Sequence, residues 1–528
     1  MRIIKSVLSL ILLLPLVVMA QSNYLNDPLV RAAFAAYDAQ IQADPQNYVA
    51  YFGRGKEYFN YKDYNRALDD LNNAIKYYPT KENVDLSQAY TMRGLIYQHN
   101  GDMMAALDDF NEALRLDPES RFSLLSRADL LCEMGNYELA KADYQMLLRK
   151  NSRNQEAYLG LARVALGEQN IGVCNENLQK AQEVNPSSAG LYLQRAGIYE
   201  QMGEYAKAVD DYVLAIVYGE SKQSVKAINR LSRKEYNVVV KSLSNVIETV
   251  EDKGYFYYLR AIIHQNNYRY TDAINDWNTI LKEKYYYFHS IFSNRSYCYM
   301  RLGQFEYAME DISHALLLKK DDISLYLTRA QLNRILGNYE KAAEDISIAM
   351  TYNPTSVNVL LQKGLLAAEQ GEYEGAADSY NEAVMYNADF AYAYLLRGVN
   401  YERLENTSAA ENNYNMILSL PDDSASFVTL KGFALSRLGR NDEAEEWAET
   451  VLQNLGANAS ISDYYNAACL YAQTGNKDKA YTYLEKALKG GYGDYYNLYF
   501  EMDSPVSLAP LRNESEFRSL VQSYSSSF

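Results

Sequence analysis

Histidine and cysteine are scarce in this sequence, and few residues of the kinds that build catalytic or metal sites stand together. The 528 residues include four histidines and four cysteines. No two of them form a Cys-x-x-Cys or His-Glu-x-x-His pair, the spacings that place metal ligands side by side. The sequence also lacks a glycine-rich phosphate loop and a Gly-x-Ser-x-Gly nucleophile elbow. We therefore expect no catalytic residues, no metal and no cofactor, and we do not expect an enzyme.

Basic residues are outnumbered by acidic ones. The chain has 51 lysines and arginines against 67 aspartates and glutamates, which gives a formal net charge of −16. A protein that binds nucleic acid or anionic lipid needs a basic surface to neutralise the phosphates. The charge balance therefore predicts that neither nucleic acid nor an anionic lipid surface is a partner.

Long apolar runs are absent after the first twenty residues. Those residues contain Arg2 and Lys5, an apolar run from Val7 to Met19, and Ala20 at the end of a small-x-small motif. This order is typical of a signal peptide, and the run is too short for an ordinary membrane-spanning helix. We predict cleavage after Ala20 and an exported mature chain without a transmembrane segment, periplasmic or secreted if the source is bacterial. An uncleaved anchor is the alternative.

One alanine position returns along the chain at a nearly constant interval of 34 residues. A fixed period of this length indicates stacked copies of one small unit. Such stacks form extended surfaces that hold other molecules. The position is held by Ala106, Ala140, Cys174 and Ala208, and then by Ala273, Ala308, Ala342, Ala376, Ala410 and Ala444.

Other positions keep a fixed offset from this alanine. A small residue precedes it by twelve, a large one often follows it by four, and proline closes several units, as Gly94, Phe110 and Pro118 do around Ala106. A glycine that ends a helix, followed by a polar residue that begins a turn, recurs between the two helices of several units. The pattern resembles the tetratricopeptide repeat (TPR), a helix–turn–helix of about 34 residues. The resemblance covers about residues 47–490 and implies an all-α TPR solenoid, a right-handed superhelix of helices A and B.

The repeats divide the chain into consecutive segments. The unit at 220–252 is degenerate, because Ala227 follows Ala196 by only 31 residues. Of the four cysteines, only Cys132 and Cys174 lie in neighbouring repeats, and whether they pair stays open. The predicted segments are a signal peptide (1–20), a capping half-repeat (21–46), repeats 1–5 (47–219), the degenerate repeat (220–252), repeats 7–13 (253–490), and a C-terminal cap and tail (491–528).

An arginine and an aspartate recur in one register of the repeats. The arginine precedes the small residue of helix A, and the aspartate follows by sixteen residues. We interpret these pairs as structural ion pairs between helices, since partly buried Arg–Asp pairs fix register more than they stabilise. They are Arg54/Asp70, Arg93/Asp109, Arg127/Asp143, Arg195/Asp211, Arg260/Asp276, Arg295/Asp311 and Arg329/Asp345.

The resemblance implies that helix A lines a concave groove. Tyrosine offers a large flat contact with little rotamer entropy to lose, and arginine receives carboxylates. The competing interpretation places many of the 51 tyrosines in the core. The candidate partner-binding residues of helix A are Phe52, Phe59, Tyr255, Tyr258, Tyr297, Arg301, Arg334, Tyr392, Arg403, Arg437 and Tyr465.

Two function classes follow from these patterns. The first is a non-enzymatic scaffold that binds a protein or an extended peptide in the groove, in the bacterial cell envelope. The second is a binding protein for carbohydrate or another small ligand, in which the groove aromatics act as stacking platforms. The sequence does not identify the partner or the oligomeric state.

Overall fold

The computed structural model describes residues 24, 27–79, 86–421, 428–499 and 506–524. The predicted signal peptide, residues 1–20, lies outside this described part. Throughout the described part the chain is built of helices and contains no strand, and no helix there is both long and apolar enough to cross a membrane. The predicted all-α solenoid is confirmed.

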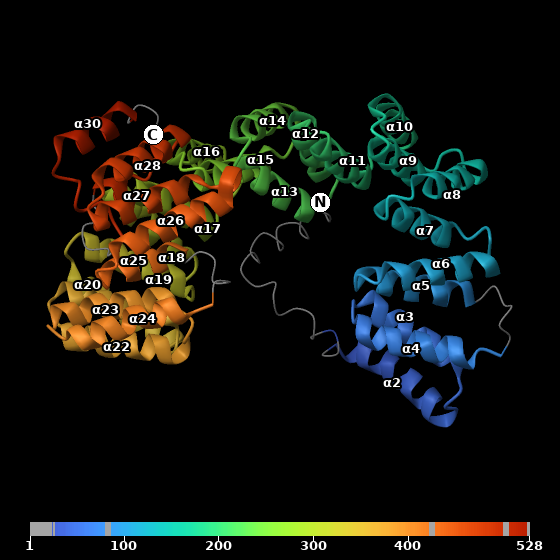
Figure 1. The fold of residues 1–528 in the computed structure, drawn as a ribbon, viewed down its shortest axis with the longest axis horizontal. Coiled ribbons are helices and arrows are strands. Elements are labelled where there is room, and N and C mark those ends of the chain that lie inside the picture. Colours follow the sequence, from blue (N-terminus) through green and yellow to red (C-terminus); the bar gives the residue numbers. More distant parts are fainter. Residues whose placement is uncertain (1–23, 25–26, 80–85, 422–427, 500–505, 525–528) are drawn as a thin grey trace. The chain divides into compact units, whose positions relative to one another are not determined.

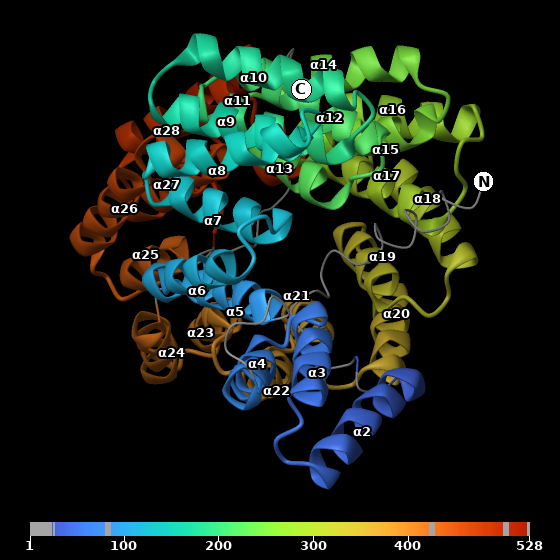
Figure 2. The same cartoon turned by 90° about the vertical axis from the view of Figure 1, so that its right-hand side faces the viewer.

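The chain divides into two compact units, Met1–Leu231 and Ser232–Phe528. In each unit, consecutive antiparallel helices pack as pairs (Figure 1; Figure 2). The first unit contains α2 (Pro28–Ala43) and the pairs α3 (Tyr48–Asn60) with α4 (Tyr64–Tyr77), α5 (Leu86–His99) with α6 (Met103–Leu116), α7 (Arg121–Glu133) with α8 (Tyr137–Lys150), α9 (Gln155–Gly167) with α10 (Ile171–Val184), and α11 (Ala189–Gln201) with α12 (Tyr205–Val217).

Helix α13 (Lys222–Ser232) lies at the boundary between the units, and α14 (Tyr236–Thr249) opens the second. The later pairs are α15 (Lys253–Asn266) with α16 (Tyr270–Lys282), α17 (His289–Arg301) with α18 (Phe305–Leu318), α19 (Ile323–Ile335) with α20 (Tyr339–Tyr352), α21 (Val357–Glu369) with α22 (Tyr373–Tyr386), α23 (Ala391–Arg403) with α24 (Thr407–Ser419), α25 (Val428–Arg437) with α26 (Asn441–Leu455), and α27 (Ile461–Thr474) with α28 (Lys477–Gly490).

Local sequence signals set the turn inside each pair. At the end of α5, Gly101 adopts a φ of 86°, a left-handed conformation that glycine reaches without strain. Asp102 then caps α6 by accepting a hydrogen bond from the Ala105 amide at 3.1 Å. Where the glycine is missing, another residue takes the left-handed conformation at the same place, as Lys62 does with a φ of 62°. The turn geometry is therefore kept even where the sequence motif is lost.

The recurring small residues let helices approach closely. Ala106, Ala140 and Ala208 are fully buried. A Cβ added at Gly160 would lie 2.2 Å from Cζ of Tyr144, so the glycine of α9 makes room for the aromatic ring of α8 in the preceding repeat. The period thus records a packing rule in which a small residue faces a large one.

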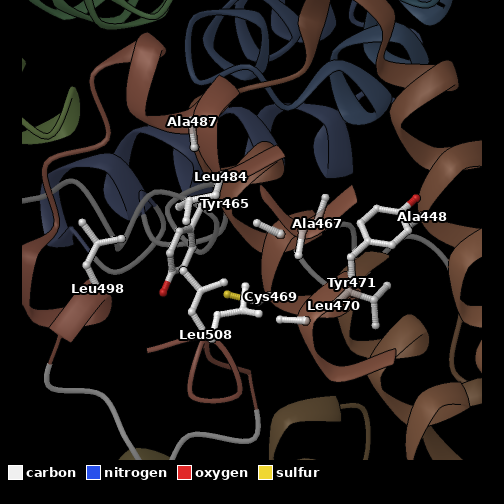
Figure 3. Packing of buried hydrophobic residues seen from close by; sticks show 14 of the residues in the cluster. Ala448, Tyr465, Ala467, Cys469, Leu470, Tyr471, Leu484, Ala487, Leu498 and Leu508 are labelled. Atoms are coloured by element: carbon white, nitrogen blue, oxygen red, sulfur yellow. The ribbon is translucent and has the colours of Figure 1, made fainter. Parts of the chain in front are cut away.

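A different kind of segment ends the chain. The short helix α29 (Tyr495–Tyr499) and the helix α30 (Ser515–Tyr524) follow the last pair. Leu498, Leu508 and Phe517 are fully buried and belong to the apolar cluster that also holds Leu484 and Tyr471 of the last pair, much of which is shown in Figure 3. The C-terminal segment therefore covers apolar surface that the last pair would otherwise expose.

Candidate functional site

The Arg–Asp pairs predicted from the sequence are all present. In the pair of α17 and α18, Arg295 donates from Nε and Nη2 to the two carboxylate oxygens of Asp311, at 2.7 and 2.6 Å. The Asp311 side chain is only 4% exposed. Burial raises the pKa of Asp311, against the effect of the guanidinium. The paired charges are therefore held away from water and fix how helix A sits on helix B.

The same arginines also reach back to the preceding repeat. In six of the seven pairs, the Nη1 atom donates to a side chain on the helix B that comes before, such as Asn278 for Arg295, at 2.6 Å. The first repeat follows this rule, because Arg54 donates to Asp38 of α2 at 2.5 Å. Helix α2 thus takes the place of a helix B, and each of these arginines joins three helices.

The Arg–Asp register is interrupted in the degenerate repeat. Lys226 and Ser242 stand where the arginine and the aspartate are expected. Repeat 11 shows a milder change, in which Arg397 donates to the Asn413 amide oxygen at 2.7 Å. Because this partner is uncharged, burial lowers the pKa of Arg397. In both repeats the charged Arg–Asp pair is therefore missing.

A second series of ion pairs runs along helices A and was not predicted. Each pair joins an acid and an arginine in neighbouring repeats, 34 or 35 residues apart in three of the four pairs below and 30 residues apart in the pair of Glu200 and Arg230. Four such pairs are Asp129–Arg163 at 2.5 Å, Glu200–Arg230 at 2.7 Å, Arg334–Glu369 with Nε to Oε2 at 3.0 Å, and Glu402–Arg437 at 3.2 Å. Opposite charges at the repeat spacing were the signal that sequence reasoning missed.

Buried tyrosines of helix B complete three of these pairs. Tyr144 donates its hydroxyl to Asp129 at 2.5 Å, and Tyr414 donates to Glu402 at 2.6 Å. Tyr212 makes the same contact with Glu200 at 2.5 Å. In each of these three pairs the acid thus contacts both a buried tyrosine and an arginine. The arginine neutralises the negative charge of the acid.

The candidate arginines of the groove do not form a free positive stripe, because most are already paired. Arg334 binds Glu369, and it is only 10% exposed. Arg437 is exposed and contacts Glu402, while Arg403 is exposed and its guanidinium lies 5.5 Å from the centre of the Tyr373 ring. The expectation of a run of unpaired positive charge is therefore corrected, because Arg301, Arg334 and Arg437 each contact an acidic side chain.

Two candidate residues of the second unit, Arg301 and Tyr465, contact the C-terminal segment. Arg301 donates to Asp494 at 3.1 Å and to Asn497 at 3.0 Å, and its guanidinium lies 5.0 Å from the centre of the Tyr297 ring. Tyr465 is 4% exposed and stacks on another tyrosine, Tyr492, with ring centres 4.2 Å apart. We therefore remove Tyr465 from the candidate surface, because its ring belongs to the core.

The remaining aromatic candidates are partly buried. Tyr258 packs edge-on against Trp277, with ring centres 5.0 Å apart. Tyr255 packs edge-on against Phe256. Tyr392 lies against two core clusters of the later repeats. These rings serve the packing of their own repeats and present only part of their surface.

In the first unit, Phe59 packs against Tyr64 and Phe52 lines a small cavity. The cavity measures about 260 Å³ and lies between α3, α4 and α5. Its other lining residues are Tyr48, Val49, Ala74, Tyr78, Leu86, Gln88 and Ala89.

The described residues contain no cluster of histidine, cysteine, aspartate and glutamate that could hold a metal ion. None of the four cysteines, all in the described part of the chain, forms a disulfide, and three of the four are buried. The open question of a bridge between Cys132 and Cys174 is thus answered for this structure, and these side chains act as small core residues.

Comparison with known proteins identifies the repeats. Family models described as tetratricopeptide repeat match residues 87–120, 125–171, 189–216, 327–394 and 464–489. Sperm-associated antigen 1 of Homo sapiens is 28% identical over 211 residues, which is 33% of this chain and 23% of that protein. The match thus spans less than a quarter of the human relative.

Some solved structures are similar to this chain at low sequence identity. Yeast Tom70 is 17% identical, with 91% of this chain and 95% of that chain covered and a TM-score of 0.35. A tetratricopeptide repeat protein from Parabacteroides merdae is 20% identical, with 55% of this chain and 99% of that chain covered and a TM-score of 0.28.

Proposed function

We propose that this chain of tetratricopeptide repeats is a non-enzymatic scaffold that binds a protein or an extended peptide along its helices A. Proteins of this repeat class generally mediate protein–protein interaction. The observation that carries the proposal is the exposed charged surface of α23 and α25, where Arg437 pairs with Glu402 and the neighbouring Arg403 lies over the Tyr373 ring.

The chemistry of this surface suits a peptide that carries carboxylates. Arg437 and Glu402 are each about one-third exposed and lie 3.2 Å apart. A ligand carboxylate can replace Glu402 at Arg437, because Glu402 keeps a second partner in the Tyr414 hydroxyl at 2.6 Å. Arg403 adds a second cation beside the ring of Tyr373. Each contact is modest, so affinity should come from several repeats together and should weaken with salt.

The proposed place of action is outside the cytoplasm. The basic, apolar and small-x-small order of residues 1–20 supports export, and a bacterial cell envelope is the compartment in which we place the scaffold.

A pull-down with the full mature chain from an envelope extract, set beside a glycan array, tests the class of ligand. Recovery of a protein that also binds the purified chain supports the scaffold. Binding to glycans with no protein recovered supports the alternative, a carbohydrate-binding protein.

Charge reversal then tests the surface. We expect Arg403→Glu with Arg437→Glu to weaken binding of the recovered protein by tenfold or more, in a titration at low salt. The control is Arg440→Glu, because Arg440 is also exposed but pairs with Glu443 at the start of α26. Equal binding by the double variant and the wild type contradicts this surface.

A further inference from the structure

The two ends of the second unit contact each other through residues that are far apart in the chain. In a stack of repeats, each repeat normally contacts only its neighbours. Here Tyr268, in the turn between α15 and α16, packs against Tyr492 with ring centres 4.8 Å apart. Lys234 donates to Asn458 at 2.8 Å across 224 residues. The first and last repeats of this unit are therefore fastened together.

The centre of this contact is the Arg301 guanidinium. Its Nη1 atom donates to Asp494 and to Asn497, which lie 193 and 196 residues later in the chain. The rings of Tyr297 and Tyr496 lie 5.0 and 5.8 Å from the guanidinium carbon. Asp494 is 3% exposed, so the charges meet out of contact with water.

The polar pairing at this point is incomplete. The Arg301 Nε atom is buried and has no hydrogen-bond partner, unlike the Nε atoms of the Arg–Asp pairs. A buried pair gains little net stability when its hydrogen bonds are not all made, and its role is to specify one arrangement. The Arg301–Asp494 contact therefore specifies the closed arrangement of the second unit. It stabilises that arrangement less than a pair with all its hydrogen bonds made would.

The contact covers part of helix A of repeat 8, one of the helices A along which we propose that a partner binds. Arg301 belongs to helix A of repeat 8 and contacts Asp494 and Tyr496 of the C-terminal segment 491–499, while Tyr297 of the same helix lies beside its guanidinium. Asp494 thus occupies the place that a ligand carboxylate would take.

We propose that the Arg301–Asp494 contact is a lock that keeps the second unit closed, and that its release opens helix A of repeat 8 to an acidic peptide. This inference rests on the proposed function for the identity of the ligand, but the opening itself is independent of it. The segment 491–499 acts as an internal competitor, and a partner with a carboxylate beside aromatic side chains displaces it.

Hydrogen exchange of the full mature chain tests the lock without any partner. We expect Asp494→Ala to speed exchange in α17 and α29 by tenfold or more, and Asp494→Asn to do so by less, while α21 and α22 keep their wild-type rates. The control is Glu514→Ala, because Glu514 pairs with Lys477 in the same C-terminal region and not with Arg301. Unchanged exchange in α17 and α29 in both Asp494 variants overturns the lock, and so does equal loss of protection in α21 and α22.

A labelled peptide of sequence GYGDYYNLY, which copies residues 491–499, tests the opened surface. Fluorescence anisotropy should show binding to Asp494→Ala at least tenfold tighter than to the wild type. The gain should vanish when Arg301→Ala is added, or when the peptide aspartate is replaced by alanine. Faster exchange without peptide binding leaves the lock standing and contradicts the displacement by an acidic ligand. Failure of the charge-reversal titration on α23 and α25 alone bears only on the proposed function.

Discussion

A single arginine in this protein serves three helices at once. Arg295 holds Asp311 of its own repeat and Asn278 of the preceding one, and Phe292 and Tyr299 each lie 5.8 Å from its guanidinium carbon. Replacement by an uncharged side chain leaves the 4%-exposed aspartate without its counter-charge. The cost of such a loss is large, because an uncompensated buried charge is poorly solvated.

We expect Arg295→Ala to lower the free energy of unfolding of the second unit by about 3 kcal/mol, the usual cost of breaking one side of a buried pair. Thermal or urea unfolding measures this loss. Partner binding should persist at temperatures where the variant is folded. Loss of binding with unchanged stability would show that this arginine belongs to the binding surface instead.

His264 gives the second unit a stability that depends on pH. It is buried in α15, its Nδ1 lies 2.7 Å from the Tyr236 hydroxyl, and burial, with smaller effects of Arg260 and Arg269, lowers its pKa to about 4. Asp276 lies 3.6 Å from its Nε2 but is already bound by Arg260. The folded protein therefore keeps this histidine neutral over a range in which the unfolded chain protonates it.

The lowered pKa of His264 sets the direction in which stability changes with pH. A histidine pKa lowered in the folded state stabilises the fold above pH 6.5, and this contribution is lost as the pH falls from about 6.5 to about 4. The maximum loss is about 3 kcal/mol, from about 1.4 kcal/mol per pKa unit. Urea unfolding across this range should show a shallower decline for His264→Gln than for the wild type. The same slope in both proteins would contradict a buried neutral histidine.

At the scale of the helix, close approach of α8 and α9 depends on a missing side chain. Gly160→Ala would place a Cβ 2.2 Å from Cζ of Tyr144, which is fully buried and also holds Asp129. We expect a loss of about 1–3 kcal/mol, typical of overpacking a core. Gly197→Ala in α11 meets nothing within 4 Å and should be neutral or gain up to about 1 kcal/mol, since alanine favours a helix. Equal effects in thermal unfolding would show that the spacing of the helices adapts.

The sequence predicted the helices because each repeat states the same rule again. The period placed the pairs, and the recurring Arg and Asp predicted the ion pairs that the structure confirms. Prediction from the sequence failed where two contacting residues are not related by the repeat spacing. The contact of Arg301 with Asp494 joins residues 193 positions apart, and no repeated pattern announces it. The pairing of Arg437 with Glu402 was readable, since opposite charges stand 35 residues apart, but only if neighbouring repeats are aligned on each other.

At the scale of the whole molecule, export remains a prediction from residues 1–20. We expect mass spectrometry of the natural protein to find an N-terminus at Gln21, because the small-x-small motif ends at Ala20. An intact Met1 terminus on protein from the cytoplasm would contradict export, and an intact terminus in the membrane fraction would indicate an uncleaved anchor.

The arginines of the seven Arg–Asp pairs, here called the ladder arginines, also bear on the order in which the chain can fold. Each finds its acceptors in its own repeat or in the one before it, as Arg54 does with Asp70 and Asp38, and Arg295 with Asp311 and Asn278. During synthesis, which proceeds from the N-terminus, such an arginine is fully paired once its own helix B has left the ribosome. The chain can therefore fold one repeat at a time as it emerges, because no ladder arginine waits for a residue that has yet to be made.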